Sequence, residues 1–374
     1  MPDTTVKYFD STMPGAPSLS GTAGALIGIL TACLKDGFGS VTVDSLVVAS
    51  DLATATVSGG HGLAMIGHVG PVIRISGASP GGLNADVRVT VTSATQFTFS
   101  TSGIADQTAT GTISAKRAPA GWSIAHSDTN KAAFKADSVE ATGLLLRVDD
   151  TGTTAARVRG YESMTDVDNG SGLFPTDAQF SGGYYAVKSS VASSATRLWR
   201  LYADHRAFYL AVDNYGTNGW LGLMFFGDLL SDVPGDAYGC KLVAGNTALN
   251  GYMIETLNNA SSIYGVLARG YAQTGGSVYC SRVAHAKNNN VLGGGGSAYP
   301  NPVDHSVLAE RVQVWDADTA LRGLMPGLFS PVHSGNPPDG TVISDWAGLE
   351  DRTLITQAIA NSYRCLIDLT GPWR

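Results

Sequence analysis

The pattern that most resembles a catalytic site is G-x-S-x-G, which spans residues 77–81 and places Ser79 at its centre. A serine nucleophile of this kind needs a strand, a sharp turn and then a helix, which together expose the hydroxyl. A strand pattern precedes Ser79, but residues 82–85 lead directly into another alternating segment. Pro80 and Gly81 are typical of a β-turn. We therefore expect Ser79 to lie in a turn and to have no catalytic role.

A calcium site is the next candidate, because Asp166, Asp168 and Asn169 precede Gly170 in an acidic segment. The EF-hand pattern requires glycine at its sixth position and a bidentate glutamate at its twelfth. Here the glycine is fifth and the twelfth residue is Asp177, a shorter carboxylate. The sequence favours a polar loop, with an irregular Ca²⁺ site as the alternative.

The histidines do not form a metal or triad pattern, since none belongs to H-x-x-x-H or H-E-x-x-H. We expect each of them to be a turn or surface residue: His61, His68, His126, His205, His285, His305 and His333. Asp204, His205 and Arg206 place an acid, a base and a cation side by side. Neighbouring residues on a strand point to opposite faces, so we interpret these three as a charged hairpin tip.

Other catalytic and cofactor patterns are also missing from the sequence. The glycines around His61 lack the third glycine and the following helix of a dinucleotide site. Asp149 and Asp150 are at turn positions, and a glycosidase pair cannot be assigned from sequence. We therefore predict no catalytic, cofactor-binding or metal-binding residues, no cofactor, and a protein that is not an enzyme.

Aromatic residues gather in residues 184–226 and are the remaining signal. Aromatic side chains fill the cores of β-sandwiches, and they also dominate protein interfaces and carbohydrate platforms. Core packing is the interpretation that we favour, with a partner or glycan surface as the alternative. The cluster comprises Tyr184, Tyr185, Trp199, Tyr202, Phe208, Tyr209, Trp220, Phe225 and Phe226.

The elements that must position these residues are mainly β-strands. Residues 41–117 carry period-2 segments with frequent turn signals, which indicates a small β-sandwich or barrel. Its strands are expected at 45–50, 53–57, 72–76, 86–92, 96–100 and 108–114. Residues 118–374 predict a larger, sandwich-like β domain, with strands at 144–148, 155–161, 184–188, 197–202, 207–212, 221–226, 277–280 and 309–315. Residues 288–297 are expected to be a flexible loop, and residues 350–360 a short helix.

Residues 1–40 form the third expected unit, an N-terminal arm and helix. Residues 1–20 contain Pro14, Pro17 and several glycines, which indicates an extended arm. A helix is expected over 23–35, capped by residues 20–22 and ended by Gly37 and Gly39.

Composition excludes several classes of partner. Charged residues are 15% of the chain, below the ~25% that is typical, which suits strands, tight turns and extended interfaces. The net charge is −7 and no Lys/Arg block occurs, so we expect no nucleic acid. The longest apolar stretch, residues 23–34, is too short to span a bilayer, and the N-terminus lacks a signal-peptide pattern. The four cysteines are widely spaced, so we expect reduced, mostly buried thiols.

Several segments resemble a family of tailed-phage virion proteins. The opening residues 6–17, with Leu19 and Gly24, are similar to that family, as are residues 61–99. Residues 145–164 and a C-terminal part that includes residues 321–328 and 371–374 resemble it too.

The resemblance covers most of the chain, and its motifs concern the fold and not catalysis. It implies a structural component of a bacteriophage particle, present in several copies, most simply a tail or baseplate subunit with other virion proteins as partners. On that interpretation the arm, residues 1–20, lies along a neighbouring subunit. The alternatives are a host-surface receptor-binding module that contacts glycan or protein, a polysaccharide-degrading tail enzyme, and a capsid decoration protein.

Overall fold

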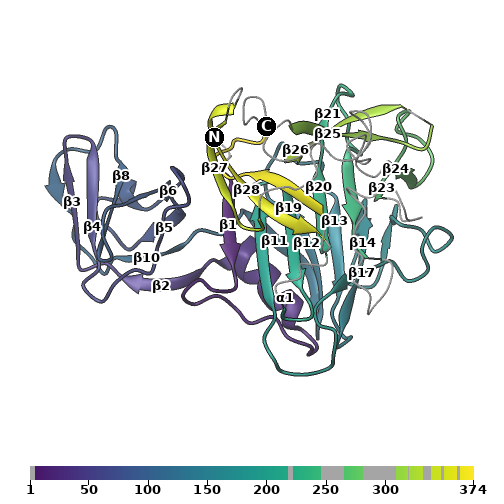
Figure 1. Cartoon of the computed structure of the whole chain (residues 1–374), viewed down its shortest axis with the longest axis horizontal. Coiled ribbons are helices and arrows are strands. Elements are labelled where there is room, and N and C mark those ends of the chain that lie inside the picture. The colour runs from purple at the N-terminus through teal and green to yellow at the C-terminus, as the bar shows by residue number, and fades with distance from the viewer. Residues whose placement is uncertain are drawn as a thin grey trace.

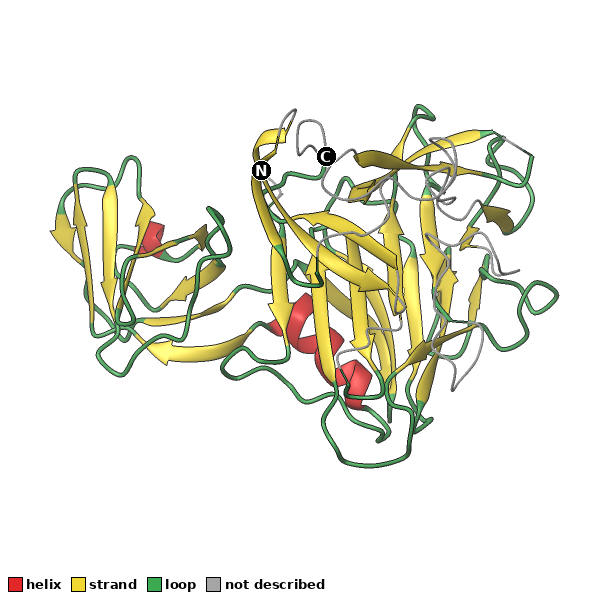
Figure 2. Cartoon of the chain, viewed as in Figure 1, coloured by secondary structure: helices red, strands yellow, loops and turns green. Residues whose placement is uncertain are grey.

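The structure is a computed structural model that describes residues 5–217, 222–245, 265–280, 309–318, 320–331, 338–346, 349–359 and 363–374. Almost all of the regular structure in these residues is antiparallel β-strand, as predicted (Figure 2). A small lobe, residues 38–117, lies on one side of a larger main body that contains the other described residues (Figure 1). The two parts have separate hydrophobic cores.

The small lobe is a sandwich of two sheets, in agreement with the sequence pattern. Its inward side chains alternate with exposed ones, so that Phe97 and Phe99 are buried while Gln96 and Ser100 are exposed. One sheet has the order β2 (Phe38–Thr42), β10 (Ser114–Arg117), β5 (Val72–Ser76), β6 (Asp86–Arg88). The other has the order β7 (Thr90–Val91), β8 (Gln96–Ser100), β4 (Leu52–Thr56), β3 (Ser45–Ala49), β9 (Gln107–Thr108).

The main body is built on a central sheet that is covered on both faces. Its described strands are, in order, β1 (Lys7–Asp10), β18 (Leu198–Ala203), β19 (Ala207–Asp213), β20 (Gly222–Asp228), β22 (Cys240–Val243), β23 (Gly265–Leu267) and β24 (Val278–Cys280). The second layer is the sheet β11 (Trp122–Asp128), β12 (Lys131–Ala136), β13 (Leu145–Asp149), β14 (Ala155–Tyr161), β17 (Tyr184–Val187). The third is β21 (Leu230–Ser231), β26 (Leu321–Pro331), β29 (Tyr363–Asp368), β28 (Leu349–Ile359), β27 (Val342–Trp346), with β25 (Ala309–Trp315) beside β26.

Two neighbouring residues of β19 show this three-layer packing. Phe208 packs against Trp122 of the second layer, with ring centroids 5.6 Å apart. Tyr209 points to the opposite face, where its ring lies 5.6 Å from that of Trp373 and its hydroxyl donates to Pro326 O at 2.8 Å. Every residue of β19 is buried. The strand is therefore a continuous apolar run, as expected when both faces of a sheet are covered.

The predicted helix is present, but it is capped differently from the expectation. α1 (Ala25–Leu30) continues as a π-helical segment (Thr31–Asp36) and ends at Gly37, whose φ is 73°. Residues 20–22 supply no side-chain cap. Asp150 does so from a distant turn, because its Oδ2 accepts the Leu26 and Ile27 N–H groups at 2.7 and 3.2 Å.

The N-terminal segment packs within its own chain, which differs from the arm expected to lie along a neighbouring subunit. β1 pairs with β18, with Phe9 opposite Leu201. Val6, Phe9 and Leu19 are buried in the main core. These apolar side chains gain more from the core than from a solvated arm, so residues 5–20 form an edge of the main body.

Three of the expected elements differ from the structure. Residues 350–360 were expected to be helical, but β28 covers Leu349–Ile359 and pairs with β27 and β29. Residues 108–114 were expected to form one strand, whereas β9 ends at Thr108 and β10 begins at Ser114, because the chain crosses between the two sheets there. The expected strand at 86–92 is likewise split into β6 and β7. The expected loop at residues 288–297 lies outside the described residues.

The structure also contains strands that the sequence analysis did not identify. They include β1, β2, β11, β12 and most of the third layer. The short pair β15 (Ser163–Met164) and β16 (Gly170–Ser171) is another addition.

Candidate functional site

Ser79 itself is in a β-bridge and not in the predicted turn, which follows it. Its backbone forms an isolated bridge with Thr110, and the 3₁₀ turn Gly81–Leu83 follows before β6 begins. A nucleophile elbow requires an α-helix directly after the serine, and three residues of 3₁₀ structure do not supply one.

The acidic segment at Asp166 is a polar loop whose carboxylates already have partners. Asp166 Oδ1 accepts the backbone N–H groups of Asp168 and Asn169 at 2.8 and 2.9 Å. Asp168 pairs with Lys131 Nζ at 2.9 Å and Arg147 Nη2 at 2.6 Å. The Asn169 side-chain amide, followed by the Asp168 N–H, lowers the pKa of Asp166, and Lys131 and Arg147 lower the pKa of Asp168. In the parts of the chain that the structure describes, no three His, Cys, Asp or Glu residues gather as metal ligands would.

Asp204, His205 and Arg206 form the predicted hairpin turn between β18 and β19, but the turn is buried and not a surface tip. Asp204 Oδ1 accepts the Arg206 and Ala207 N–H groups at 2.8 and 2.7 Å, and its Oδ2 accepts Arg374 Nε at 2.9 Å. The His205 ring is buried, and burial lowers its pKa. Both carboxylate oxygens of Asp204 therefore already have partners, one in the turn and the other in Arg374.

The other described histidines have mixed environments. His61 is buried, in contrast to the expected surface position, and its Nε2 lies 2.9 Å from Ser93 O. His68 is exposed, and its Nε2 lies 3.1 Å from Asp345 Oδ2. His126 Nε2 lies 3.2 Å from Met164 O. His285, His305 and His333 lie outside the described residues.

The aromatic cluster forms core, as the favoured interpretation predicted. Seven of its residues are buried: Tyr184, Trp199, Tyr202, Phe208, Tyr209, Phe225 and Phe226. Tyr185 is half-buried, with the Arg157 guanidinium 3.9 Å from its ring centroid. Trp220 lies outside the described residues. A glycan platform requires exposed ring faces, and these buried rings cannot provide one. The prediction for the cysteines is also confirmed, since all four are free and buried.

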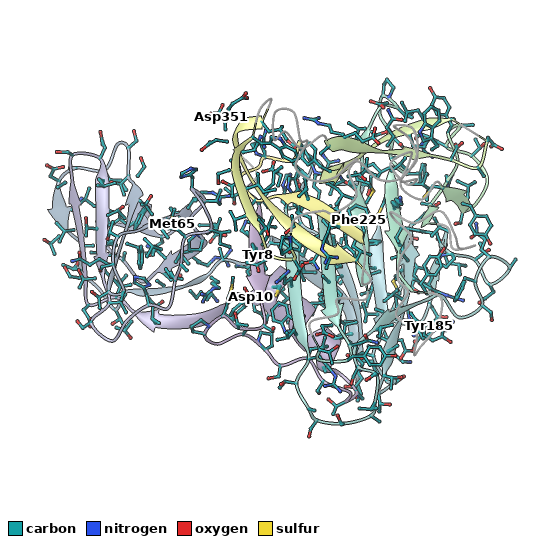
Figure 3. All side chains as sticks on the ribbon, in the orientation of Figure 1. Tyr8, Asp10, Met65, Tyr185, Phe225 and Asp351 are labelled. Atoms are coloured by element: carbon teal, nitrogen blue, oxygen red, sulfur yellow. The ribbon has the colours of Figure 1, made fainter. Side chains whose placement is uncertain are left out.

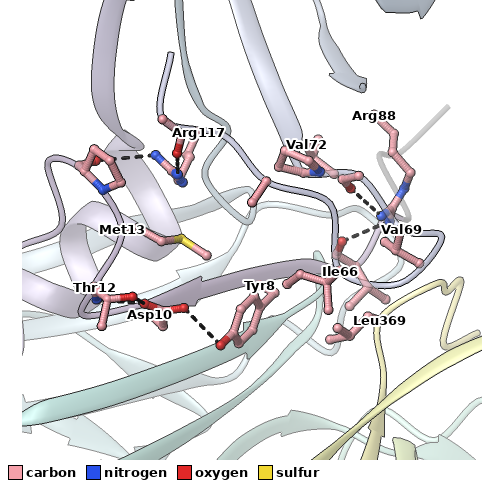
Figure 4. A pocket seen from close by; sticks show the side chains of 16 residues that line it. Tyr8, Asp10, Thr12, Met13, Ile66, Val69, Val72, Arg88, Arg117 and Leu369 are labelled. Atoms are coloured by element: carbon pink, nitrogen blue, oxygen red, sulfur yellow. Dashed lines mark hydrogen bonds between the residues drawn. The ribbon is translucent and has the colours of Figure 1, made fainter. Parts of the chain in front are cut away.

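The feature that sequence reasoning missed is a cavity of about 280 Å³ between the small lobe and the main body (Figure 4). The main body supplies the N-terminal segment, with Tyr8, Asp10 and Thr12 on one wall. The small lobe supplies residues 62–72 on the facing wall, together with Arg88 and Arg117. Figure 3 places Tyr8 and Asp10 on the side of the main body that faces the lobe residue Met65.

The polar part of the cavity is organised around Asp10. The Tyr8 hydroxyl donates to Asp10 Oδ2 at 3.1 Å, and the Thr12 N–H donates to Asp10 Oδ1 at 2.7 Å. Burial first, and the Asp10 charge second, raise the pKa of Tyr8 far above its usual value. The phenol therefore remains protonated and acts as a hydrogen-bonding group only.

Two arginines connect the lobe to the N-terminal segment through backbone carbonyls. Arg88 Nη1 donates to Gly70 O at 2.9 Å, and its Nη2 donates to Val6 O at 3.1 Å and to Thr370 O at 3.3 Å. Arg117 Nη2 donates to Gly62 O at 2.9 Å and its Nη1 to Pro14 O at 3.4 Å. Hydrogen bonds to charged groups each contribute about 1.5–3 kcal/mol. The two arginines therefore hold the lobe against the body.

The Arg117 side chain is 5% exposed, and its Nε–H has no hydrogen-bond partner among the described residues. Burial lowers the pKa of this guanidinium, and Asp10 acts in the opposite direction. The Arg117 Cζ also lies 5.6 Å from the centroid of the Phe38 ring. Two backbone carbonyls and one aromatic ring therefore hold the guanidinium in place.

The remaining lining is apolar and comes from both parts: Val6, Met13, Ile66, Val69, Val72 and Leu369. A second hollow of about 440 Å³ adjoins the first, because Tyr8, Asp10 and Thr12 line both. Its far wall contains Arg200 and Asp339, which pair at 2.9 Å. The N-terminal segment therefore runs between two cavities.

A further polar pocket of about 460 Å³ lies at the opposite end of β18 and β19. Its charged groups are paired within the chain. Asp228 binds Arg206 at 3.0 Å and the Thr142 N–H at 2.9 Å, and Asp236 binds Arg322 at 2.8 Å. These ion pairs and hydrogen bonds stabilise the fold, and the paired groups are not free to bind a substrate.

The polar groups of the first cavity are already hydrogen-bonded to one another. Its acid has three hydrogen bonds from Tyr8 and Thr12, and no described group near it has the partners of an activated nucleophile. Sequence reasoning missed the cavity because its two walls are far apart in the chain. In the described residues no helix is long and apolar enough to cross a membrane.

Comparisons with known proteins add no family for this chain. No family model matches it, and no curated protein matches it either.

Proposed function

We propose that this chain is a structural component of a bacteriophage particle, a tail or baseplate subunit that makes assembly contacts and has no enzymatic activity. The observation that carries the proposal is the place of residues 6–17, on which the resemblance to phage virion proteins partly rests. This segment pairs with β18 and also receives Arg88 and Arg117 from the lobe. The resembling segment thus fixes the small lobe and the main body to each other.

The use of charge supports a structural role. Lys188 and Asp150 form an ion pair with both side chains fully buried, and Arg322 and Asp236 form another at 2.8 Å. Buried pairs of this kind require fixed surroundings, because each partner alone is costly to bury. Rigid, internally braced units suit a subunit that transmits load in an assembly.

The partners in this proposal are other virion proteins and further copies of the chain, without nucleic acid and without membrane insertion. A host-surface glycan was the alternative partner. The aromatic residues that suggested it are mostly buried, so no observation favours that function.

The test is to locate the chain in phage particles. Val139 is 95% exposed and the four native cysteines are buried, so V139C supplies one accessible thiol for a gold–maleimide label. Particles that contain V139C are imaged beside particles that contain the unlabelled wild-type chain. Gold on the tail or baseplate in a regular number of copies is the expected result. Gold on the capsid overturns the tail assignment, and absence of the chain from purified particles overturns the proposal.

A further inference from the structure

His205 is a buried histidine whose ring has no hydrogen-bond partner among the described residues. It lies in the turn between β18 and β19, and 4% of its surface is exposed. Both ring nitrogens, Nδ1 and Nε2, are buried without a described partner. A buried polar group without a partner is costly, and the cost is far greater when the group carries a charge. The folded turn therefore favours the neutral ring.

Four charged side chains act on this ring, two of each sign. The Asp204 carboxylate already accepts three hydrogen bonds. Glu140 Oε2 lies 3.9 Å from His205 Nε2, too far for a hydrogen bond, and its side chain is 54% exposed. The cations are Arg206 and Arg374. Burial has the largest effect and lowers the pKa of His205, the two arginines lower it further, and the two carboxylates act in the opposite direction.

The turn connects several parts of the main body. Trp122 of the second layer donates its Nε1–H to Asp204 O at 3.2 Å. Arg374 Nε donates to the Asp204 carboxylate at 2.9 Å. The same guanidinium also donates to Asp228 O and Leu229 O, at 2.8 and 3.1 Å. A disturbance in this turn therefore acts on the central sheet, the second layer and the C-terminal segment together.

Protonation would place a third cation in this region. A protonated imidazole carries a donor on each nitrogen, but no described acceptor lies within hydrogen-bond distance of either nitrogen of His205. The positive ring would also repel the guanidinium groups of Arg206 and Arg374. These costs disappear when the turn opens and the ring enters water.

We propose that His205 is an acid-sensitive switch, which keeps the β18–β19 turn and Arg374 in place while its ring is neutral and releases them when the ring is protonated. The inference does not rest on the proposed function, because it concerns the isolated chain. A histidine in water takes up its proton near pH 6.5, at about its ordinary pKa, whereas the closed turn lowers that pKa. The closed turn therefore has its full stability above about pH 6.5 and loses stability as the pH falls below that value.

Hydrogen exchange of the purified chain, measured by mass spectrometry, tests this switch. The wild type is compared with H205Q, whose side chain stays neutral, and comparison at the same pH removes the intrinsic dependence of exchange on pH. The reporters are the Arg206 and Ala207 amides, which donate to Asp204 in the closed turn. The ratio of wild-type to H205Q exchange rates is expected to rise about tenfold between pH 8 and pH 5.5, because opening gains about a factor of ten for each pH unit below the ordinary histidine value.

H126Q is the matched control for loss of a histidine. His126 lies four residues along β11 from Trp122, and its Nε2 is 3.2 Å from Met164 O. The Arg206 and Ala207 amides of H126Q are expected to exchange as in the wild type at both pH values. Exchange in β3 and β4 of the small lobe serves as the internal reference.

Two results of the exchange measurement would overturn the switch. One is a rate ratio that changes by less than about twofold between pH 8 and pH 5.5. The other is an acid response that is lost in H126Q but kept in H205Q. Should H205Q fail to fold, the His205 ring of the wild type is titrated by NMR. A ring that is still mainly neutral at about pH 6 in the folded chain supports the switch, and a ring that is half protonated at or above about pH 6.5 overturns it.

Discussion

Replacing Lys188 with methionine tests whether the buried ion pair holds the helix to the second layer of the main body. Lys188 Nζ contacts Asp150 Oδ1 and donates to Thr22 O and Gly152 O, both at 2.7 Å. Both side chains of the pair are fully buried. Methionine keeps most of the apolar stem and removes the charge together with its hydrogen bonds, so K188M tests the polar contribution of Lys188.

The expected loss of unfolding free energy is about 4 kcal/mol at pH 8. Removing one partner of a buried pair costs about 3–5 kcal/mol, because the other charge remains buried without compensation. Thr22 O and Gly152 O each lose a donor, which adds to the loss. Asp150 keeps the Leu26 and Ile27 N–H donors, which offsets part of it. Since the partners share one network, D150L/K188M is expected to cost less than the sum of the single changes.

The loss is also expected to depend on pH. Burial raises the pKa of Asp150, and its bonds to Lys188 act in the opposite direction. In K188M the opposing bonds are gone, so the folded-state pKa lies further above the unfolded value of about 3.9. An acid of this kind supplies stability below its unfolded pKa and loses it as pH rises through its folded pKa. K188M is therefore expected to be destabilised less at pH 5 than at pH 8.

Urea unfolding followed by tryptophan fluorescence measures this effect. Residues 38–117 contain no tryptophan, so the signal reports on the main body. K131M is the matched control, because Lys131 pairs with Asp168 at the surface, where such pairs contribute about 0–1 kcal/mol. A K188M loss below about 1 kcal/mol at pH 8, or an equal loss at both pH values, would refute the reasoning.

Three further predictions concern packing, thiol burial and the lobe contact. G160A is expected to lose about 1–3 kcal/mol in thermal unfolding, because a Cβ at Gly160 would lie 2.1 Å from Phe174 Cζ; an unchanged melting temperature contradicts this. The four cysteines are expected to react with a thiol reagent only in urea, because burial raises the pKa of Cys33 and Cys240 and hides all four; fast reaction of the folded protein would contradict it. R117A is expected to increase limited proteolysis where the lobe joins the body, because its bond to Pro14 O is lost; unchanged cleavage would show that the lobe is held by other contacts.

The sequence was sufficient for the fold class because the strand signals are local. Phe97 and Phe99 alternate with polar neighbours and form a strand with one buried face. Residues 207–212 are apolar throughout, and β19 is buried throughout. In both cases a short window of side chains determines the strand, whatever the strand packs against.

The errors occurred where distant segments decide the structure. Residues 350–360 contain a short apolar run that suits a helix or a strand, and only pairing with β27 and β29 makes it a strand. The helix cap comes from Asp150, which is 124 residues from Leu26. The cavity joins Asp10 to Arg117, and no spacing rule relates residues so far apart. Local patterns therefore identified elements but not the site that the elements build.

The low charge of the chain has a different explanation from the one that the composition suggested. A content of 15% charged residues favoured extended interfaces. The central sheet offers another cause, because β18 and β19 are covered on both faces and have few positions that face water. Strands buried on both faces lack the alternating polar residues of a one-sided sheet, so the three-layer core itself lowers the charged fraction. The low fraction of charged residues therefore does not support a large interface. The assembly proposal depends instead on residues 6–17, which pair with β18 and receive Arg88 and Arg117 from the lobe.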